Sequence, residues 1–342
     1  MGVNRIKNID EIVTQSGTVV DLNNIQASGS GGTVSASGLA ISRTEDSQYI
    51  DYAFNEGSTN THEADGHSSS ADAVMFGGTD NTLKKFSDST IKESYGTAKD
   101  STFSTSNGAI ALIAGGGDKN QDVHSKSFAS SSTSSTFGTL ITGRYQGADG
   151  SDGTISMLAG GTVSGGNTDT IERMSFASAA ISSNGTLRGQ YNHHRGGSNG
   201  TYLMTVGGWG SSGSNASDLI AFESNTVAAE HGTITTARMQ MAVCSNTDQL
   251  MLAAGYMPAN TGATEMKLFS DKSVCEGWNT IESKHALSAG GNGEIAMFAG
   301  GDNGATVASC HTKSFADKSI YVTFGVINQA TSHSWGCSGQ AA

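Results

Sequence analysis

The chain has 342 residues and a formal net charge of −12, and only 15% of its residues are charged. Nucleic-acid binding needs a clustered basic surface, which this acidic composition does not supply. No run approaches the roughly 18 apolar residues of a membrane span. The sequence therefore excludes a nucleic-acid partner and membrane insertion.

The first 30 residues differ from the rest of the chain. The segment "NRIKNIDEIVTQSGTVVDLNNIQ" is followed by "ASGSGG", a composition typical of a flexible linker. Within it, "IDEIV" predicts either one helical turn or a strand. We expect residues 1–30 to attach the protein to something larger, and residues 31–342 to form the main domain. The alternative is a frayed chain end.

Three sequence markers repeat along residues 76–325. They occur in six copies, with nearly constant spacing between the markers of one copy and the next. The phenylalanines of "KSFA"-like segments lie 42 to 48 residues apart: Phe86, Phe128, Phe176, Phe222, Phe269 and Phe315. A double glycine, or its variant Ala254-Gly255, begins at residues 77, 115, 160, 207, 254 and 300. The glycine of "FGT"-like segments, replaced by Asn279 in one copy, stands at residues 96, 138, 185, 232, 279 and 325. Such self-similarity is the signature of a repeat architecture.

Each copy contains four short strands by its pattern. Asn-Gly or Asp-Gly, as in "SNG" (198–200), predicts a hairpin with a type I′ turn, in which both central residues have positive φ. The strand after that turn is almost continuously apolar, as in "TISMLAGG" (154–161), which indicates burial on both faces. A four-stranded sheet of about 46 residues must stack on its neighbours, and this is the period of a propeller blade.

The double glycine has a structural interpretation. Glycine adopts backbone dihedrals closed to other residues and permits close backbone approach, both useful where blades converge. A phosphate-binding loop is the competing interpretation. That reading requires a helix after the glycines, or a following Gly-Lys-Ser/Thr, and each double glycine here opens a polar loop.

The two ends of the repeat set the number of blades. The C-terminal "FGVINQATSHSWGCSGQAA" (324–342) begins a unit that it does not finish. We expect "TVSASGLAIS" (33–42) and "SQYIDYAFN" (47–55) to complete that unit, because a ring closed by both termini leaves no open sheet edge. The predicted fold is an all-β propeller of seven four-stranded blades, the seventh composite; six blades is the alternative.

The order of turn, apolar strand, double glycine, loop, aromatic strand and return resembles kelch repeats of the galactose-oxidase type over residues 50–340. An arginine precedes the inner hairpin at Arg144 and Arg238, as in many kelch units, although the other copies do not match at this position. The sequence pattern "FGT…sNG…aGG…sFas" is similar to that of propellers encoded by tailed bacteriophages. Those proteins are regarded as tail-fibre or other virion-surface proteins, so the resemblance implies such a role.

A search for catalytic or metal chemistry finds none in the sequence. The four cysteines form no CxxC pair or zinc-like spacing, and we expect buried thiols. The only histidine cluster, "NHHRGG" (192–197), places neighbours on opposite faces of a strand, which suits chelation poorly. Galactose-oxidase chemistry would need two tyrosines, two histidines and a Tyr–Cys crosslink, and we cannot place that set. We predict no enzyme activity, no metal and no cofactor.

Carbohydrate binding needs no fixed catalytic or metal-binding motif, only exposed aromatic and polar side chains. Trp209 and Tyr256 each follow a double-glycine position, so they are expected in the loop between the second and third strands. Arg144 and Arg238 lie in connections that should share a face with that loop. Two aromatics and two arginines on one rim make a candidate ligand face. The alternative is that all four residues stabilise contacts between blades.

The leading functional hypothesis is a structural virion-surface protein of a tailed bacteriophage, located in the tail or capsid surface and assembled in the host cytoplasm. It would contact other virion proteins through residues 1–30, bind a host-surface glycan or receptor, and form a homo-oligomer in the particle. The alternatives are a carbohydrate-active or galactose-oxidase-like enzyme, and a passive capsid or tail decoration.

Overall fold

The computed structural model describes residues 11–13, 19–21, 63–64, 67–68, 73–77, 81–87, 89, 93–94 and 103–339, the last range with gaps at 117, 257, 274, 319–320 and 334–335. The chain divides into two compact units, Met1–Thr59 and Asn60–Ala342. In the first unit β1 (Glu11–Val13) pairs antiparallel with β2 (Val19–Asp21), so part of "IDEIV" forms a strand and not a helical turn. The predicted domain boundary at residue 30 lies outside the described residues.

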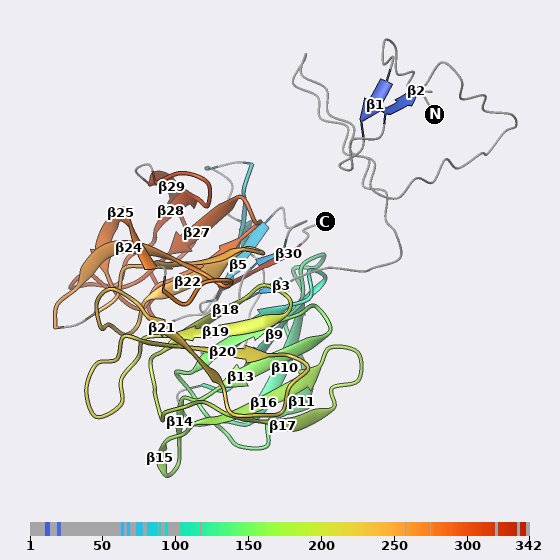
Figure 1. Cartoon of the computed structure of the whole chain (residues 1–342), viewed down its shortest axis with the longest axis vertical. Coiled ribbons are helices and arrows are strands. Elements are labelled where there is room, and N and C mark those ends of the chain that lie inside the picture. Colours follow the sequence, from blue (N-terminus) through green and yellow to red (C-terminus); the bar gives the residue numbers. More distant parts are fainter. Residues whose placement is uncertain are drawn as a thin grey trace, which may run out of the picture. The chain divides into compact units, whose positions relative to one another are not determined.

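The described residues of the second unit form six sheets of four or more strands, which we name blades I to VI (Figure 1). The strands of each blade are given in order from the first strand of the repeat to the fourth. Blade I contains β30 (Gly336–Gly339), β5 (Ala73–Phe76), β6 (Thr82–Lys85) and β7 (Glu93–Ser94). Blade II contains β8 (Phe103–Ser106), β9 (Ile110–Ala114), β10 (Asp122–Ser127) and β11 (Ser135–Thr139). Blade III contains β12 (Ala148–Ser151), β13 (Ile155–Ala159), β16 (Thr170–Ser175) and β17 (Ile181–Thr186).

The remaining blades follow the same order. Blade IV contains β18 (Arg195–Ser198), β19 (Tyr202–Val206), β20 (Ala216–Ala221) and β21 (Ala229–Thr233). Blade V contains β22 (Ala242–Ser245), β23 (Gln249–Ala253), β24 (Thr261–Leu268) and β25 (Cys275–Lys284). Blade VI contains β26 (Ser288–Gly291), β27 (Ile295–Ala299), β28 (Ser309–Ser314) and β29 (Val322–Val326), and two further strands, β4 (His67–Ser68) and β3 (Glu63–Ala64), extend it beyond β26. A small hairpin, β14 (Thr162–Val163) with β15 (Gly166–Asn167), decorates blade III.

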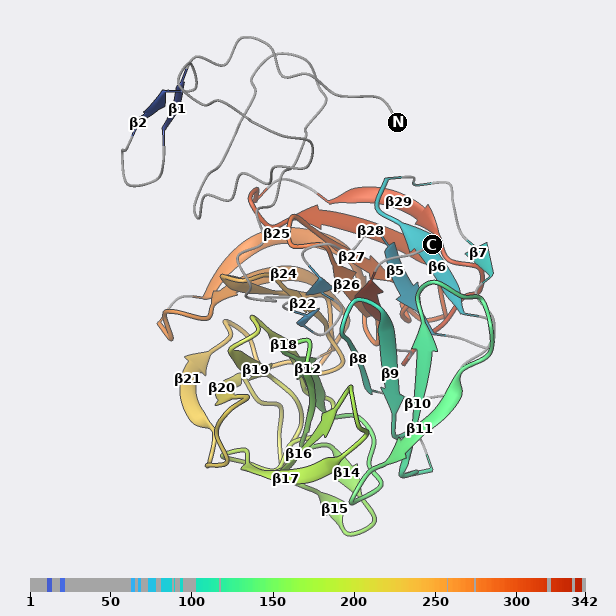
Figure 2. The ribbon, with the colours of Figure 1, turned by 90° about the vertical axis from the view of Figure 1, so that its right-hand side faces the viewer.

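The first strands of the six blades close into a ring. β8 contacts β12, β12 contacts β18, and the series continues through β22, β26 and β30 until β30 contacts β8 again. A hydrogen bond from the Ser104 hydroxyl to the Gly336 carbonyl (3.1 Å) joins blade II to the C-terminal strand of blade I. The arrangement is a propeller-like ring of small antiparallel sheets, seen in Figure 2 with β8, β12, β18, β22 and β26 around the centre.

The prediction of seven blades is wrong for the described residues. A composite blade does close the ring, but the C-terminal strand β30 pairs with β5, residue for residue from Gly336↔Phe76 to Gly339↔Ala73. The unit that begins at the C-terminus is therefore the same unit that carries the first double glycine, and counting them separately added a blade. The strands expected at 33–42 and 47–55 lie outside the described residues.

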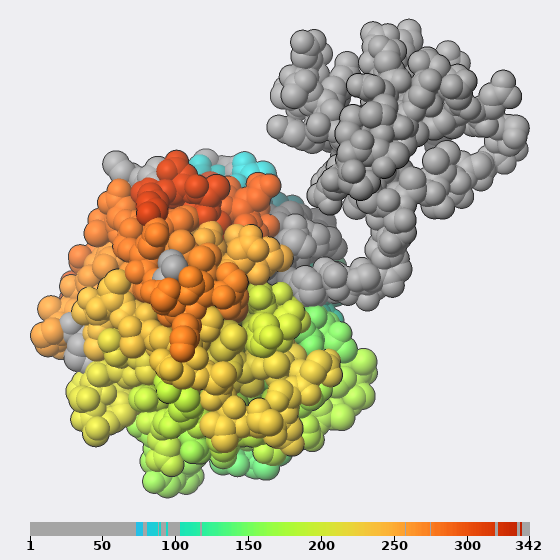
Figure 3. Space-filling view, viewed as in Figure 1, coloured from blue at the N-terminus to red at the C-terminus, as the bar shows by residue number. Residues whose placement is uncertain are grey.

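The core lies between blades, and the repeated phenylalanine helps to build it. Phe128 of blade II belongs to a buried cluster with Met75 of blade I, and Phe222 of blade IV packs in a cluster with Met157 of blade III. Each sheet thus covers a face of its neighbour, as stacked repeats must. In the space-filling view the surfaces of blades III to VI adjoin one another in sequence from green to orange (Figure 3).

The double glycines hold the blades together, as the structural interpretation predicted. Both glycines have positive φ, for example 61° at Gly160 and 92° at Gly161. The second glycine donates its N–H to a connection of the next blade, as from Gly161 to the Tyr191 carbonyl (2.9 Å). A β-carbon on Gly161 would lie 2.6 Å from the carbonyl oxygen of Tyr145, so a side chain there has no room.

The "FGT" element is a β-bulge on the fourth strand. In blade IV, Ala216 pairs with Thr233 and Asp218 with Glu230, so one residue of β20 faces two of β21, and Gly232 has a φ of 74°. Asn279 replaces the glycine in blade V and takes a φ of 66°, a conformation that Asn tolerates better than most residues. A β-carbon on Gly232 would lie 2.1 Å from the Lys272 carbonyl of the next blade, which explains the glycine.

The inner hairpins differ from the predicted turn. The glycines after Asn107, Asp152, Asn199 and Asn292 have φ between 81° and 87°, while the Asn and Asp residues themselves do not have positive φ. A type I′ turn requires it at both central residues, so that prediction is wrong. The Asn107 side-chain oxygen instead accepts the backbone N–H groups of Ala109 and Ile110, and this local bond shapes the turn.

A short hairpin lies against the first strands of the ring. β3 pairs antiparallel with β4, and His67 of β4 pairs in parallel with Gly291 at the end of β26. β3 also contacts β8, β12 and β18, and β4 contacts β30. Because these first strands surround the ring axis, the hairpin lies at the axis, at the end where the Asn-Gly turns are.

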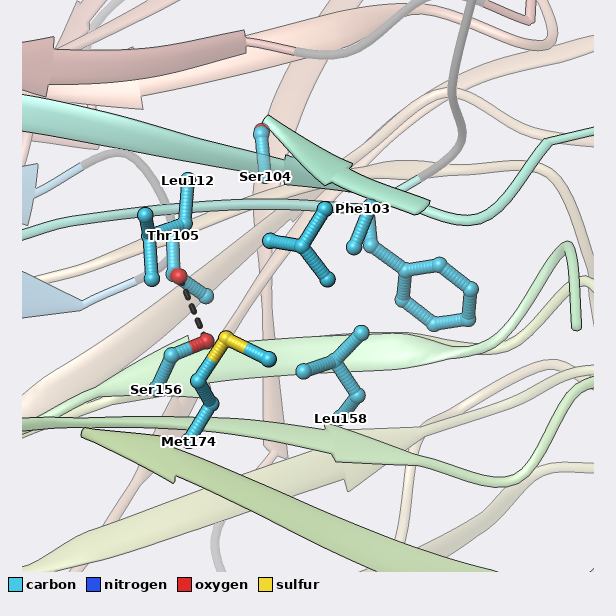
Figure 4. Close-up of a pocket in the computed structure, with 9 residues that line it drawn as sticks. Phe103, Ser104, Thr105, Leu112, Ser156, Leu158 and Met174 are labelled. Atoms are coloured by element: carbon cyan, nitrogen blue, oxygen red, sulfur yellow. Dashed lines mark hydrogen bonds between the residues drawn. The ribbon is translucent and has the colours of Figure 1, made fainter. Parts of the chain in front are cut away.

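A cavity between blades II and III has a volume of about 10 Å³ and is lined mainly by apolar side chains such as Leu112, Leu158 and Met174 (Figure 4). A hydrogen bond from Thr105 to Ser156 (2.7 Å) crosses it. That volume is at the lower limit for a single water molecule, so the cavity is a packing gap and not a ligand pocket.

Candidate ligand-binding face

One face of the ring carries both the loops between second and third strands and the connections between blades. We name it the loop face. In four blades the residue after the double glycine pairs with the residue three positions before the first strand. These pairs are Thr162–Tyr145, Trp209–Asn192, Tyr256–Met239 and Asp302–His285. The backbone at these positions is the same in each blade, whereas the side chain changes from Thr to Trp, Tyr and Asp.

Trp209 and Tyr256 lie on the loop face, where the sequence predicted them, in neighbouring blades IV and V. Their backbones are fixed by paired hydrogen bonds, 2.8–2.9 Å for Trp209 with Asn192 and 2.9–3.1 Å for Tyr256 with Met239. Their side chains stay 38% and 36% exposed. The ring therefore presents two aromatic side chains to solvent on a backbone held by hydrogen bonds.

Arg144 is in the interior of blade III and not on that surface. Its guanidinium is fully buried, forms an ion pair with Glu172, and donates to the carbonyl oxygens of Gly160 (3.1 Å) and Thr170 (2.8 Å). The Glu172 carboxylate also accepts the backbone N–H groups of Ile141 and Thr142. Burial lowers the pKa of Arg144, and Glu172 partly offsets this.

Arg238 repeats the arrangement in blade V. It is 1% exposed and pairs with Glu265 at 2.8 Å, and Glu265 also accepts the backbone N–H of Thr235. Both arginines tie a connection between blades to the third strand of the blade that the connection enters. The structure thus brings Trp209 and Tyr256 to one surface but leaves the two arginines beneath it, in contacts that hold blades together.

A second repeated feature surrounds the ring axis on the loop face. Five residues, each near the start of a first strand, have left-handed backbones with φ between 53° and 60°, and we name them the axial belt: Gln146, His193, Gln240, Ala286 and His333. From His193 onward, each member donates its N–H to the carbonyl of the member before it in the chain, at 2.6 to 3.0 Å. Left-handed backbones at residues other than glycine are costly and cluster at functional sites, so the belt is a candidate site.

Side chains from the belt meet one another and reach Tyr256. The Gln240 amide nitrogen lies 2.9 Å from Nε2 of His333, so connections from different blades are bridged. The His333 ring lies 6.1 Å from the His285 ring, which in turn lies 5.6 Å from the ring of Tyr256. His285 Nδ1 donates to Asn260 at 2.9 Å. One contiguous group of polar and aromatic side chains thus links the axis to the exposed tyrosine.

A cationic side chain, that of Arg195, lies beside the belt. Arg195, the first residue of β18, is partly exposed and lies close enough to His193 and His333 to lower the pKa of both. Burial is the larger cause, and it brings the pKa of His193 to about 4. Asp302 acts in the opposite direction on His333, but its carboxylate accepts the N–H of Gly304 in its own loop (2.8 Å).

The clustering of histidines along the sequence does not indicate the belt. "NHHRGG" is a poor metal site, and His285 and His333 stand far from it in the chain. A signal was present, because Gln146, His193 and Gln240 are 47 residues apart and stand at the same offset before their strands. Repeat position, and not local clustering, would have found it.

Metal and thiol chemistry find no site among the described residues. No group of three His, Cys, Asp or Glu in that part of the chain is arranged to hold a metal ion. Cys244, Cys275 and Cys310 form no disulfide, and burial is the main cause that raises the pKa of both Cys275 and Cys310 to about 12. Where the structure describes the chain, a helix with the length and hydropathy of a membrane span is absent.

Acid is expected to destabilise the ring through His194. This side chain is 1% exposed, and burial brings its pKa to about 3. The unfolded chain, with a histidine pKa near 6.5, then binds the extra proton between about pH 6.5 and 3, so stability falls as pH falls through that window. The loss is up to about 1.4 kcal/mol per pH unit for this group. Urea unfolding of wild type and His194→Gln at pH 8, 6 and 5 measures it.

The variant should lose less stability than wild type between pH 8 and pH 5, whatever its stability at pH 8, where both proteins carry a neutral side chain at this position. Equal losses in the two proteins would contradict a neutral buried His194.

Comparison with models of known protein families, and with curated proteins, finds no match to this chain. The case for a function therefore depends on the geometry of the loop face.

Proposed function

We propose that the protein is a recognition module that binds carbohydrate through its loop face. The observation that carries this proposal is the pair of exposed aromatic side chains, Trp209 and Tyr256, at equivalent positions of neighbouring blades. Exposed aromatic faces stack on sugars, and amides beside them supply the hydrogen bonds that orient a ligand. Asn192 and Asn260 lie next to Trp209 and Tyr256 through the same loop contacts, and their amide nitrogens donate to Thr162 and to the Asp302 carbonyl.

We propose further that this binding serves attachment of a tailed bacteriophage to its host, with the propeller on the virion surface and residues 1–30 joined to other virion proteins. The support is the sequence resemblance to kelch-like, phage-encoded propellers, together with a repeated backbone that carries different side chains at loop positions such as 209 and 256. In this proposal the protein acts by binding and not by catalysis.

A glycan screen with the full-length protein tests the proposal. We expect binding to a limited set of glycans, and a loss of affinity of about tenfold or more in Trp209→Ala and Tyr256→Ala, since removal of an aromatic anchor commonly costs about 2 kcal/mol. Tyr202→Ala is the matched control. Tyr202 is 37% exposed but follows the Asn199-Gly200 turn at the opposite face, so its removal should leave binding unchanged.

Retained binding in both loop-face variants, or equal losses in all three, would contradict a site on the loop face. No binding to any glycan would contradict carbohydrate recognition, and turnover of a bound glycan would favour an enzyme.

A further inference from the structure

The axial belt and its neighbours offer one cationic side chain and several hydrogen-bond donors. Arg195 of β18 lies beside the belt, where its guanidinium donates to the carbonyl oxygens of Gly147 (3.5 Å) and His194 (3.3 Å). The belt side chains of His193, Gln240 and His333 lie near it, with His285 beside Tyr256. Asp302 is a neighbour of opposite charge, and one of its two carboxylate oxygens accepts the N–H of Gly304 (2.8 Å). A guanidinium, imidazoles and amides together form a set that suits an anion.

The cationic side chain beside the belt contrasts with the negative charge of the protein as a whole. The chain carries a formal net charge of −12, so an unselected patch of its surface would be negative. Within the described residues, the Nδ1 atom of His193 is buried and has no hydrogen-bond partner. The Nδ1 atoms of the buried His194 and His311 share this state, so the case for a ligand depends on the groups around the belt.

Tyr256, which is close to the belt, narrows the class of anion that fits this site. Tyr256 is exposed and its ring is in the same chain of contacts, through His285 to His333. A ligand that covers this group must present a flat apolar surface to Tyr256 and a negative charge to the belt. A pyranose that carries a carboxylate has both features, whereas a neutral sugar has only the first.

We propose that the loop face binds sugars bearing a carboxylate, with the carboxylate at the axial belt near Arg195 and His333 and the sugar ring against Tyr256. This proposal rests on the proposed carbohydrate binding and names its substrate class. Arg195 provides the positive charge, and Gln240 and the belt histidines provide hydrogen bonds. Belt positions with left-handed backbones hold these groups in place before the ligand arrives.

The test compares trigalacturonic acid with its methyl ester, which keeps the sugar rings but replaces each carboxylate with a neutral ester. Binding to the full-length protein is measured by calorimetry at pH 7 in 50 mM and 500 mM NaCl. We expect the acid to bind at least tenfold more tightly than the ester at low salt, and the difference to shrink at high salt because screening weakens charge pairing. This comparison needs no variant, so it stands even where a substitution disturbs folding.

Two variants locate the charge. Arg195→Gln is expected to lower the affinity for the acid to that for the ester, while the affinity for the ester stays the same. Arg173→Gln is the control, because Arg173 lies on β16 and contacts Asn184, away from the belt. Circular dichroism of both variants confirms folding.

The outcomes separate this inference from the proposed function. Equal affinity for acid and ester, with loss of both in Tyr256→Ala, would overturn the charge inference and keep carbohydrate binding. Binding of other, neutral glycans with no binding of either probe would also overturn it. Failure to bind any glycan would remove the proposed function itself.

Discussion

Replacing Arg144 with methionine is expected to lower the free energy of unfolding by about 3–5 kcal/mol. Methionine keeps much of the volume but leaves the Glu172 carboxylate, which is 2% exposed, without its cationic partner. Removing one member of a buried pair strands a charge away from water, and this is the costly direction. Urea unfolding at pH 7 measures the change.

A companion variant separates charge from packing. In Arg144→Met/Glu172→Gln the stranded charge is gone and the amide oxygen can still accept from Ile141 N–H, so part of the loss should return. Lys318→Met is the exposed control. Lys318 and Glu276 pair with 60% and 46% of their side chains exposed, and such exposed pairs contribute little to stability because solvent screens them. An Arg144→Met loss as small as that of Lys318→Met would contradict the structural role of the buried pair.

Ending the chain before β30 should be as damaging as any single substitution. The strand supplies the first position of blade I, pairs with β5 along its whole length and contacts β26 and β8 on either side. Without it the edge of β5 is open, and the ring loses the contact that closes it. We expect a loss of at least about 3 kcal/mol, or about 6 °C or more in Tm, because 1 kcal/mol corresponds to roughly 2–4 °C in domains of up to about 250 residues.

The matched control is a chain that ends at Gly339, which keeps all of β30 and should melt like wild type. Differential scanning calorimetry of the two truncations at equal concentration provides the measurement. If the chain that ends before β30 also melts like wild type, the ring is not closed by its C-terminus.

The repeat made most of the architecture predictable. Markers such as Phe222 and Gly207-Gly208 recur because each blade must bury the same face and turn at the same place, and the structure shows that physical cause in both cases. The number of blades was harder to predict from the sequence. One unit is divided between the two ends of the repeat region, and only the pairing of β30 with β5 shows that the halves belong together.

The site was predictable in part. Trp209 and Tyr256 stand directly after a structural marker, so their position in the loop followed from the pattern. The burial of Arg144 did not follow, because its partner Glu172 is 28 residues away on another strand. The axial belt depended on left-handed backbone conformations at residues such as His193, and nothing in a single copy of the repeat indicates these.

Hydrogen exchange measured by mass spectrometry, with and without the tightest-binding glycan from the screen, tests the central claim most directly. Binding at the loop face predicts slower exchange in residues 207–215, 254–260 and 236–241, which carry Trp209, Tyr256 and Gln240. Exchange around the Asn199-Gly200 turn at the opposite face should stay the same. Protection confined to that opposite face, or to the outer strands, would contradict the claim that recognition lies on the loop face.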